Sequence, residues 1–527
     1  MENHAEQFEG IHISRSVNHS FGKFGRLFPA LPRHVAPTED LVALAENMLR
    51  SKDTRDGIPA GYTYLGQFMT HDLTFDATTL TERATDIDYI WNFRTPALNL
   101  DSMYGSGPAQ CPHLFTLDKN GDRTLFLINK LVESKLIEPQ QPKMFYDLPR
   151  VSIMQANDAE EAFEDRKNLY SKNRKVEAEH LALVVDPRHD SHLLISQLLT
   201  AFLLFHNKIV KKLINDPKLM KKHSKIKELG HTRGDSVFEV ARRIVTWHYQ
   251  YLILNDYLPK IINQALFAPD FLKNLIANKK ARQYFNWRNE PFIPVEFSVA
   301  AFRLGHSQVL DSYILNTRLK NTGAESSVMG HLFSSEGKDI NLRHQKKPDS
   351  FVEWRHFFFS DTEKGNANNK ISPHITLPLK KLPFVSEKTP NMPNLAFRNL
   401  ARSISLELPS GENVAKTMSL TEGYQKEVQE HIELLKQIDR YSSLRGNTPL
   451  WYYILAEAEA KGDGKLGILG GTIVAEVIIG LIHGDKNSYL NQNPQWTPQE
   501  EEKLLDYEGG ILTMIDFMKF AGVYSYE

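Results

Sequence analysis

The sequence predicts a mainly α-helical protein built as a single large domain with few short strands. Two observations predict this fold class: the longest hydrophobic patterns have helical spacing, and alternating strand patterns are rare and short. A length of 527 residues suggests about three or four domains. No Gly/Ser-rich or Pro-rich linker and no internal repeat divides the chain, however. We therefore expect one helical body over residues 1–527, onto which residues 1–55 pack as an N-terminal extension.

The predicted helices follow hydrophobic patterns and stop signals. The segment from His192 to Leu213 is apolar on almost every side over its first turns, which indicates a helix buried all round. Ser236 and Glu239 form a capping-box pattern for a helix that we expect to stop at Pro259. Further helical patterns cover residues 40–50, 424–439, 449–461 and 471–482, and residues 124–127 are a strand candidate.

Composition excludes several classes of protein. Lys and Arg total 63 against 64 Asp and Glu, so no overall positive field exists to bind nucleic acid. Cys111 is the single cysteine, so no intrachain disulfide forms, and its role stays unassigned. The start of the chain lacks a basic region followed by an apolar core. We expect a cytoplasmic location, with unconventional export as the alternative.

The most apolar run extends from Leu466 to Ile482. It contains Glu476 and four glycines, and it is slightly short for the ~20 residues of a membrane span. We therefore expect a buried helix and no transmembrane segment. The sequence leaves the oligomeric state open.

Three segments place polar residues where a ligand site would need them. In the helical pattern from Gly61 to Phe75, Gln67 and His71 share a face, whereas Asp72 is turned about 100° away. A structural histidine would fit the same spacing.

A second segment, the helix expected after Pro294, puts Arg303 and His306 on one face, with Gly305 beside them. In the third, Arg188 precedes the buried helix and brings a permanent charge that requires an anionic or strongly polar partner. Asn399 and Arg402, further along, offer a hydrogen-bonding amide and a partner for an acid.

A fourth segment alternates oxygen-bearing positions along an extended loop. Thr95, the Ala97 carbonyl, Asn99 and Asp101 suit a hard cation such as calcium. An ordinary Asx-rich turn is the alternative explanation of the same spacing.

Taken in order, these segments resemble the animal-type haem peroxidases, the superfamily of myeloperoxidase, peroxinectin and the cyclooxygenases. The resemblance is closest to the compact bacterial members and extends through nearly the whole chain. The segments that carry it are GYTYLGQFMTHD, NFRTPALNLDSMYG, DPRHDSHLLISQLLTAFLLFHN, ARRIVTWHYQYLILNDYLP, AFRLGHS, FRNLARSISLELPSG, TPLWYYILAEAE and VAEVIIGLI. The resemblance implies a helical domain that encloses a haem.

The resemblance assigns roles on both sides of that haem. On the proximal side, His306 is implied as the iron ligand and Asn399 as the residue that hydrogen-bonds its other ring nitrogen. Arg303 and Arg402 are implied as partners of the haem propionates.

On the distal side, His71 is implied as the acid and base that moves the peroxide proton. Arg188 is implied as the residue that stabilises negative charge as the O–O bond breaks. Gln67 is implied as the residue that polarises distal water or halide. Asp72, Thr95, Ala97, Asn99 and Asp101 match the calcium site of the family.

Three departures from the family pattern limit this transfer. Thr70 and Ser191 stand where many members have acids that form ester bonds to haem, so we expect non-covalently held haem b. Asn99 replaces the usual aspartate, which should weaken calcium binding.

The resemblance implies a peroxidase that reduces hydrogen peroxide through a ferryl intermediate and oxidises small phenol-like donors. A haem fatty-acid dioxygenase is the first alternative. Dioxygenases of the cyclooxygenase type place a tyrosine three residues before the proximal histidine, where this chain has Arg303. A haem-binding protein without significant turnover is the second alternative. The sequence does not identify the reducing substrate.

Overall fold

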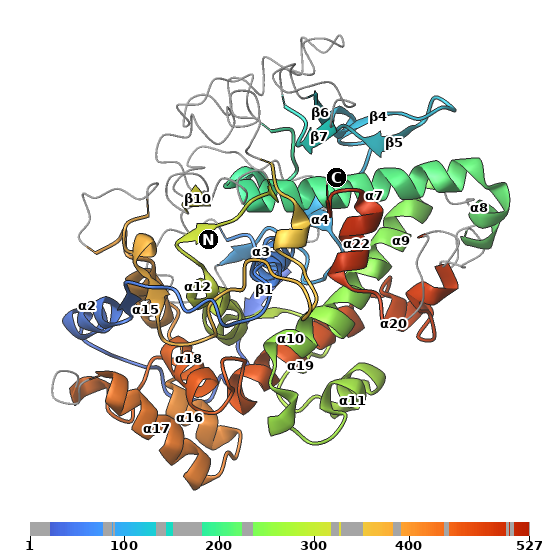
Figure 1. The fold of residues 1–527 in the computed structure, drawn as a ribbon. Coiled ribbons are helices and arrows are strands. Elements are labelled where there is room, and N and C mark those ends of the chain that lie inside the picture. The colour runs from blue at the N-terminus through green and yellow to red at the C-terminus, as the bar shows by residue number, and fades with distance from the viewer. Residues whose placement is uncertain are drawn as a thin grey trace.

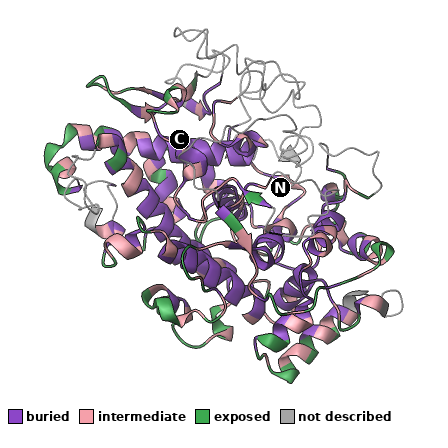
Figure 2. Cartoon of the chain, turned by 180° about the vertical axis from the view of Figure 1, so that it is seen from behind, coloured by how far each residue is buried: buried purple, intermediate pink, exposed green. Residues whose placement is uncertain are grey.

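The computed structural model describes residues 22–76, 87, 90–132, 144–150, 182–223, 236–317, 326–327, 351–382, 391–436, 442–501, 505 and 511–525. Its secondary structure is 53% helical with few short strands, which confirms the predicted fold class. The longer helices are α2 (Thr38–Asn47), α3 (Gly61–Leu73), α7 (Leu193–Asn215), α9 (Val237–Leu252), α15 (Leu395–Ser405), α17 (Glu422–Lys436), α18 (Leu450–Ala460) and α19 (Ile468–Gly484). Buried residues gather in the middle of the molecule and exposed residues at its edge (Figure 2).

The remaining elements are short. The short helices are α4 (Asp101–Tyr104), α8 (Pro217–His223), α10 (Leu258–Ile261), α11 (Phe271–Ala277), α12 (Gly305–Gln308), α16 (Gly411–Thr417), α20 (Tyr489–Gln492) and α22 (Met514–Ala521). The strands are β1 (Gly22–Gly25), β2 (Leu49–Arg50), β3 (Trp91–Asn92), β4 (Phe115–Leu117), β5 (Arg123–Phe126), β6 (Asn129–Val132), β7 (Met144–Asp147), β8 (Ile293–Pro294), β9 (Ser312–Tyr313), β10 (Ser326–Ser327) and β11 (Ile375–Thr376). β1 pairs with β3 and β8, and the other strands form two-stranded pairs.

Helix α7 is the longest of the described helices, and it packs against α3, α9 and α22 (Figure 1). Its N-cap is His192, and most of its residues are buried, as the apolar pattern predicts. By length and composition it is the one helix among the described residues that could span a membrane, but 89% of its apolar stretch is buried inside the protein. It is therefore a core helix.

Helix α19 contains the apolar run with Glu476 in its middle. The Glu476 carboxylate accepts hydrogen bonds from the backbone N–H groups of Gln283, Tyr284 and Phe285, at 2.8 to 2.9 Å. A buried carboxylate is tolerated when its oxygens are paired in this way. The Glu476 carboxylate therefore anchors the neighbouring loop of residues 283–285.

Two helix predictions need correction. Pro259 does not end the helix begun at Ser236, because a π-helical turn, Ile253–Tyr257, connects α9 to α10. Proline cannot donate the usual helical hydrogen bond, and an irregular turn before it accommodates that loss. The helix expected after Pro294 is also broken, into a π-helical turn Glu296–Ala300, a short turn and α12.

From β1 onward, the N-terminal residues contact elements from later in the chain. Helix α2 lies against α15 and α17, and β2 pairs with β11 in parallel. Residues 1–21 of the predicted extension lie outside the described residues.

Candidate functional site

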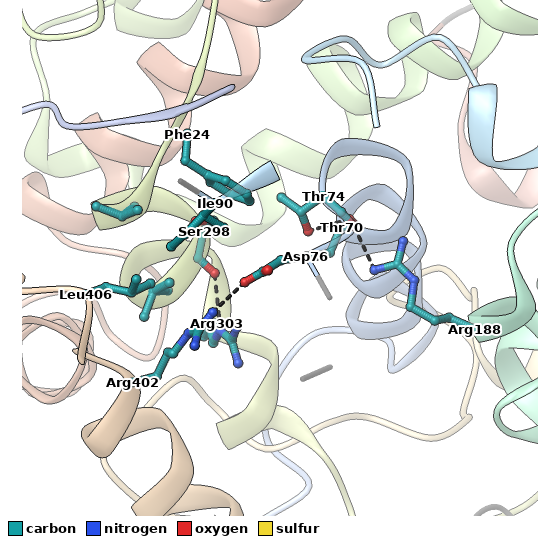
Figure 3. Close-up of a pocket in the computed structure, with 12 residues that line it drawn as sticks. Phe24, Thr70, Thr74, Asp76, Ile90, Arg188, Ser298, Arg303, Arg402 and Leu406 are labelled. Carbon is teal, nitrogen blue, oxygen red and sulfur yellow. Dashed lines mark hydrogen bonds and ion pairs between the residues drawn. The ribbon is translucent and has the colours of Figure 1, made fainter. Parts of the chain in front are cut away.

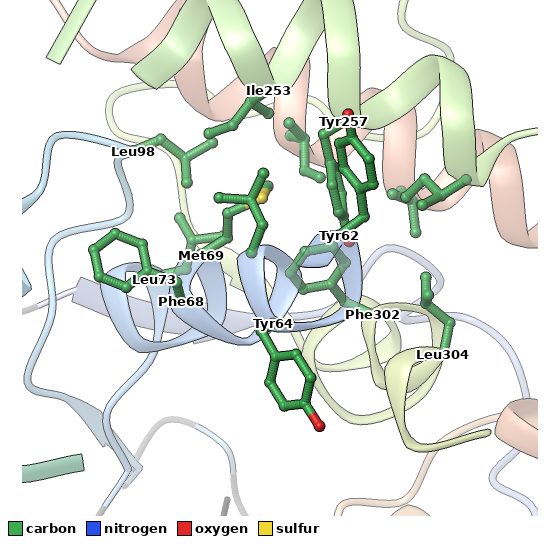
Figure 4. Close-up of a cluster of buried hydrophobic side chains, with 14 of the residues drawn as sticks. Tyr62, Tyr64, Phe68, Met69, Leu73, Leu98, Ile253, Tyr257, Phe302 and Leu304 are labelled. Carbon is green, nitrogen blue, oxygen red and sulfur yellow. The ribbon is translucent and has the colours of Figure 1, made fainter. Parts of the chain in front are cut away.

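Helix α3 carries Gln67, His71 and Asp72 and is fixed by packing over almost its whole surface. Gln67 is half-buried, and every other residue of α3 is buried. Met69 and Leu73 point to the side of the helix where the core of α9 and its π-helical turn lies (Figure 4). This packing fixes the rotation of α3 and therefore the direction of each of its polar side chains.

The segment from Arg188 to His192 runs beside α3 and contacts it with three side chains. Arg188 Nη2 donates to the backbone oxygen of His71 at 2.9 Å. The His189 ring lies 5.2 Å from the His71 ring, and burial lowers the pKa of His189 to about 3, so this neighbour is neutral. His192 Nε2 lies 2.9 Å from Gln67 Oε1. Each predicted distal residue of α3 thus has a neighbour from this segment.

Asp186 holds the guanidinium of Arg188 in place. Arg188 donates to its two carboxylate oxygens at 3.0 and 2.6 Å, and Arg94 donates to it at 2.5 Å. Burial alone would raise the pKa of Asp186, but the charges of Arg188 and Arg94 hold it well below the usual range. Arg188 Nη1 also donates to the Thr74 carbonyl at 2.7 Å. Counting the bond to His71, four of the five N–H groups of Arg188 are used, which leaves one for a ligand.

The loop predicted to bind calcium is held by its own hydrogen bonds. Asp101 Oδ2 accepts from the N–H and hydroxyl groups of Thr95 at 3.0 and 2.9 Å. Asn99 Oδ1 accepts from the Asp101 N–H at 3.1 Å, the contact expected of an Asx turn. Ala97 is buried in the same loop. Among the described residues, no group of three or more His, Cys, Asp or Glu side chains gathers as a metal site would require.

Asp72 faces this loop and not the side of His71. It accepts hydrogen bonds from the Leu100 N–H at 3.0 Å and from Ser102. Burial and the charge of Asp101 raise the pKa of Asp72 to about 8. Arg94 Nε lies 3.8 Å from Asp101, so part of the negative charge is already balanced. The buried Asp72 carboxylate and the half-buried Asp101 carboxylate repel each other and would fit a cation, while Asn99 and Arg94 reduce the negative charge available to it. Calcium binding stays a prediction.

The predicted proximal residues His306 and Asn399 connect α12 to α15. Asn399 Nδ2 lies 2.7 Å from His306 Nδ1, and Arg303 Nη1 donates to Asn399 Oδ1 at 3.1 Å. Burial and the charge of Arg303 lower the pKa of His306 well below its usual range, so the imidazole is neutral, as a metal ligand must be.

The orientation of the Asn399 amide decides where the His306 proton lies. An amide nitrogen donates, so His306 Nδ1 accepts here and the ring proton lies on Nε2. Metal coordination through Nε2 requires the opposite arrangement, with Oδ1 accepting from Nδ1–H. Arg303 holds the Asn399 amide in this orientation through its hydrogen bond to Oδ1. If Arg303 paired with another anion instead, the amide could turn.

A cavity of about 50 Å³ lies between α3, the π-helical turn Glu296–Ala300 and α15 (Figure 3). Arg402 forms an ion pair with Asp76 at its edge, and Arg303 Nε donates to the Ser298 carbonyl at 3.2 Å. Its lining residues are Phe24, Thr70, Thr74, Asp76, Ile90, Arg188, Val295, Ser298, Val299, Arg303, Arg402 and Leu406. One carboxylate among three arginines makes this wall positive, which suits a ligand with carboxylate groups.

The cavity thus brings together residues that the sequence predicted separately. Arg188, Arg303 and Arg402 line it, as does Thr70, the position of one missing ester-forming acid. Four predicted residues do not line it: Gln67, His71, His306 and Asn399.

Sequence reasoning missed Asp76, Arg94 and Asp186 as partners of the predicted arginines. Arg94 lies in the motif NFRTPALNLDSMYG and Asp186 in DPRHDSHLLISQLLTAFLLFHN. The rule that a buried arginine needs an anion could have identified Asp186 as the partner of Arg188.

Comparison with known proteins connects part of this chain to one family. Residues 145–383 match the family model described as animal haem peroxidase. This stretch contains Arg188, Arg303 and His306 and ends before Asn399. This part of the chain therefore matches an animal haem peroxidase domain, which confirms the resemblance found in the sequence.

Two curated relatives are similar to parts of the chain. The chain is 23% identical over 295 residues to chorion peroxidase of Drosophila melanogaster, covering 54% of this chain and 34% of that protein. It is 30% identical over 95 residues to heme peroxidase 2 of Caenorhabditis elegans, covering 17% of this chain and 13% of that protein. The chain thus spans about a third or less of these relatives.

The solved structures show the fold. Peroxidase A of Dictyostelium discoideum aligns with a TM-score of 0.59 and 14% identity, covering 96% of this chain and 94% of that one. A fatty acid alpha-dioxygenase of Arabidopsis thaliana aligns with a TM-score of 0.52 and 13% identity, covering 94% and 75%.

Proposed function

We propose that this protein is a haem-dependent peroxidase that reduces hydrogen peroxide and oxidises a small organic, phenol-like donor. One observation carries the proposal: the neutral His306 is held by Asn399 at 2.7 Å, next to Arg303 on the wall of the positive cavity. The matched family supports the same activity.

The residues present fit a haem on two counts. A neutral, half-buried imidazole supplies the nitrogen ligand that haem iron takes. Arg303 and Arg402 supply positive charge for two propionate carboxylates, and both line the cavity. Asp76 pairs with Arg402 in this structure, so it would compete with a propionate for that guanidinium.

Haem, when bound, supplies the iron that accepts the two oxidising equivalents of hydrogen peroxide. The protein's own residues then divide the remaining tasks. His306 would hold the iron, with Asn399 orienting its ring. His71 would take a proton from hydrogen peroxide and return it to the leaving oxygen. Arg188 would stabilise the charge that develops there with its remaining N–H group. Gln67 would hydrogen-bond the distal ligand.

Haem b without ester bonds is part of the proposal. Thr70 lines the cavity, but its hydroxyl donates to the Gly66 carbonyl at 2.9 Å, and a hydroxyl cannot form the ester that a carboxylate forms. Ser191 likewise lacks the required acid.

The test is reconstitution with haem, followed by absorption spectra before and after peroxide with a panel of phenols. We expect a Soret band, a rapid spectral change on adding peroxide, and oxidation of at least one phenol. His71→Ala should slow the reaction with peroxide by orders of magnitude, at least ~100-fold. His306→Ala should perturb or abolish haem binding. His431→Ala is the matched control, because His431 is a half-buried histidine of α17 paired with Glu459.

Experiments on the same haem-loaded protein distinguish the proposed peroxidase from the two alternative functions. Robust oxygen uptake with linoleate and no added peroxide would favour the fatty-acid dioxygenase. A Soret band without any change on adding peroxide would favour a haem-binding protein without turnover. An unchanged peroxide reaction in His71→Ala would remove His71 from its role.

A cytoplasmic location and a calcium ion at Asp72, Thr95, Ala97, Asn99 and Asp101 remain part of the proposal. Cell fractionation tests the first. Metal analysis before and after chelation tests the second.

A further inference from the structure

His192 and Gln67 form a hydrogen-bonded pair that the roles above do not use. His192 is wholly buried at the N-terminal end of α7, with its ring 5.5 Å from the ring of Tyr64. Its Nδ1 accepts from the Ile195 N–H at 3.4 Å, which makes it the N-cap of α7. Its Nε2 lies 2.9 Å from Gln67 Oε1.

These contacts fix the direction of each hydrogen bond. Because His192 Nδ1 accepts from a backbone N–H, it carries no proton, and the ring proton lies on Nε2. Nε2–H therefore donates, and the atom of Gln67 that faces it must be the acceptor, Oε1. The opposite orientation of the Gln67 amide would set two donors against each other. Gln67 is thus locked with its NH2 group turned away from His192.

Gln67 lies about one helical turn before the residues of α3 that line the cavity. Gln67 is the one residue of α3 that is not buried, and Thr70, three residues on and on the same face, lines the cavity. Within the described residues, the Gln67 NH2 group makes no hydrogen bond. It is therefore a donor available to a ligand.

We propose that His192 is a positioning residue that keeps the Gln67 NH2 group directed at the distal ligand. The distal side then offers a fixed hydrogen-bond donor and selects small anions and other acceptors. The inference that Gln67 donates to a distal ligand rests on the proposed function, because it requires haem in the cavity. The hydrogen bond between His192 and Gln67 does not depend on the proposed function.

His192→Asn isolates this role. Asparagine is a good N-cap, so α7 keeps its start, but its shorter side chain lacks the Nε2–H group that reaches Gln67. The probes are fluoride bound to the ferric haem-loaded protein, an anion that accepts hydrogen bonds, and carbon monoxide bound to the ferrous form, a weak acceptor. We expect His192→Asn to weaken fluoride binding roughly tenfold or more and to leave carbon monoxide binding within about twofold.

Gln67→Leu completes a double-mutant cycle. If His192 acts through Gln67, adding His192→Asn to Gln67→Leu should weaken fluoride binding no further. Unchanged fluoride binding in His192→Asn, equal weakening of both ligands, or a full additive loss in the double variant would overturn the proposal.

The same double-mutant cycle is also measured by urea unfolding of the protein without haem. There the two substitutions should be non-additive by roughly two- to tenfold in the folding equilibrium constant. Additive effects would refute the hydrogen-bonded pair whether or not the protein is a peroxidase. Failure of the wild type to react with peroxide would instead count against the proposed function alone.

Discussion

Replacing Asp186 by asparagine should destabilise the protein by about 3–5 kcal/mol, the usual cost of breaking a buried ion pair from one side. Asp186 is fully buried and accepts three charged hydrogen bonds, two from Arg188 and one from Arg94. Asparagine keeps the shape of the side chain but removes the charge and one acceptor oxygen. Two guanidinium groups would then stay buried without the carboxylate that they share.

The assay is urea unfolding at pH 7, followed by far-UV circular dichroism. Asp270→Asn is the control, because Asp270 pairs with Lys273 at 2.9 Å while both side chains are largely exposed. Its φ of 59° is one that asparagine tolerates. An exposed pair contributes about 0–1 kcal/mol, so this variant should unfold almost as the wild type does.

The dependence on pH adds a second readout. The pKa of Asp186 in the folded protein lies below its unfolded value of about 3.9, so its contribution is present above that pH and is lost as the pH falls. Asp186→Asn should therefore lose less stability than the wild type between about pH 4 and pH 2. The reasoning would be refuted if the free energy of unfolding of the variant stayed within about 1 kcal/mol of the wild-type value at pH 7 and depended on pH below 4 as the wild type does.

Three further predictions concern the cofactors and Asp72. Acid–acetone treatment should release all the haem, since Thr70 and Ser191 cannot form esters; haem left on the protein would contradict this. Asn99→Asp should strengthen calcium binding roughly tenfold by adding a charged ligand, measured by titration after chelation, and equal affinities would argue against the site. Without divalent cations, stability should fall as the pH rises from about 4 to 8, because the folded protein keeps Asp72 protonated and the unfolded chain does not. Asp72→Asn should flatten this slope in thermal unfolding scans, and a slope that persists would show that another group titrates.

The sequence predicted the regular helices well because their patterns are local. Helix α7 is apolar on nearly every side and is buried on nearly every side, and Ser236 caps α9 with a hydrogen bond to the Glu239 N–H. The π-helical turns before α10 and α12 could not be predicted in the same way. They depend on how distant segments pack, and a proline rule applied alone placed one helix end incorrectly.

The site was predictable residue by residue but not contact by contact. Arg188, Arg303 and Arg402 were identified from their motifs, and the cavity collects all three. Asp186, the partner of Arg188, is only two positions away, but Arg402 meets Asp76 across 326 positions. No local pattern signals such a pair, so charge balance in the cavity emerges only from the fold.

Arg94 links the loop that faces Asp72 to the end of α3 that carries His71. Its guanidinium donates to the His71 carbonyl at 3.2 Å and to Asp186 at 2.5 Å, and it lies 3.8 Å from Asp101. One buried cation therefore touches the backbone of the predicted proton carrier, the carboxylate that holds Arg188, and the loop that would hold calcium. A cation bound at the loop would offset the attraction of Asp101 for the Arg94 guanidinium and would also repel that guanidinium. We therefore expect cation binding at the loop to be coupled electrostatically, through Arg94, to the end of α3 that carries His71.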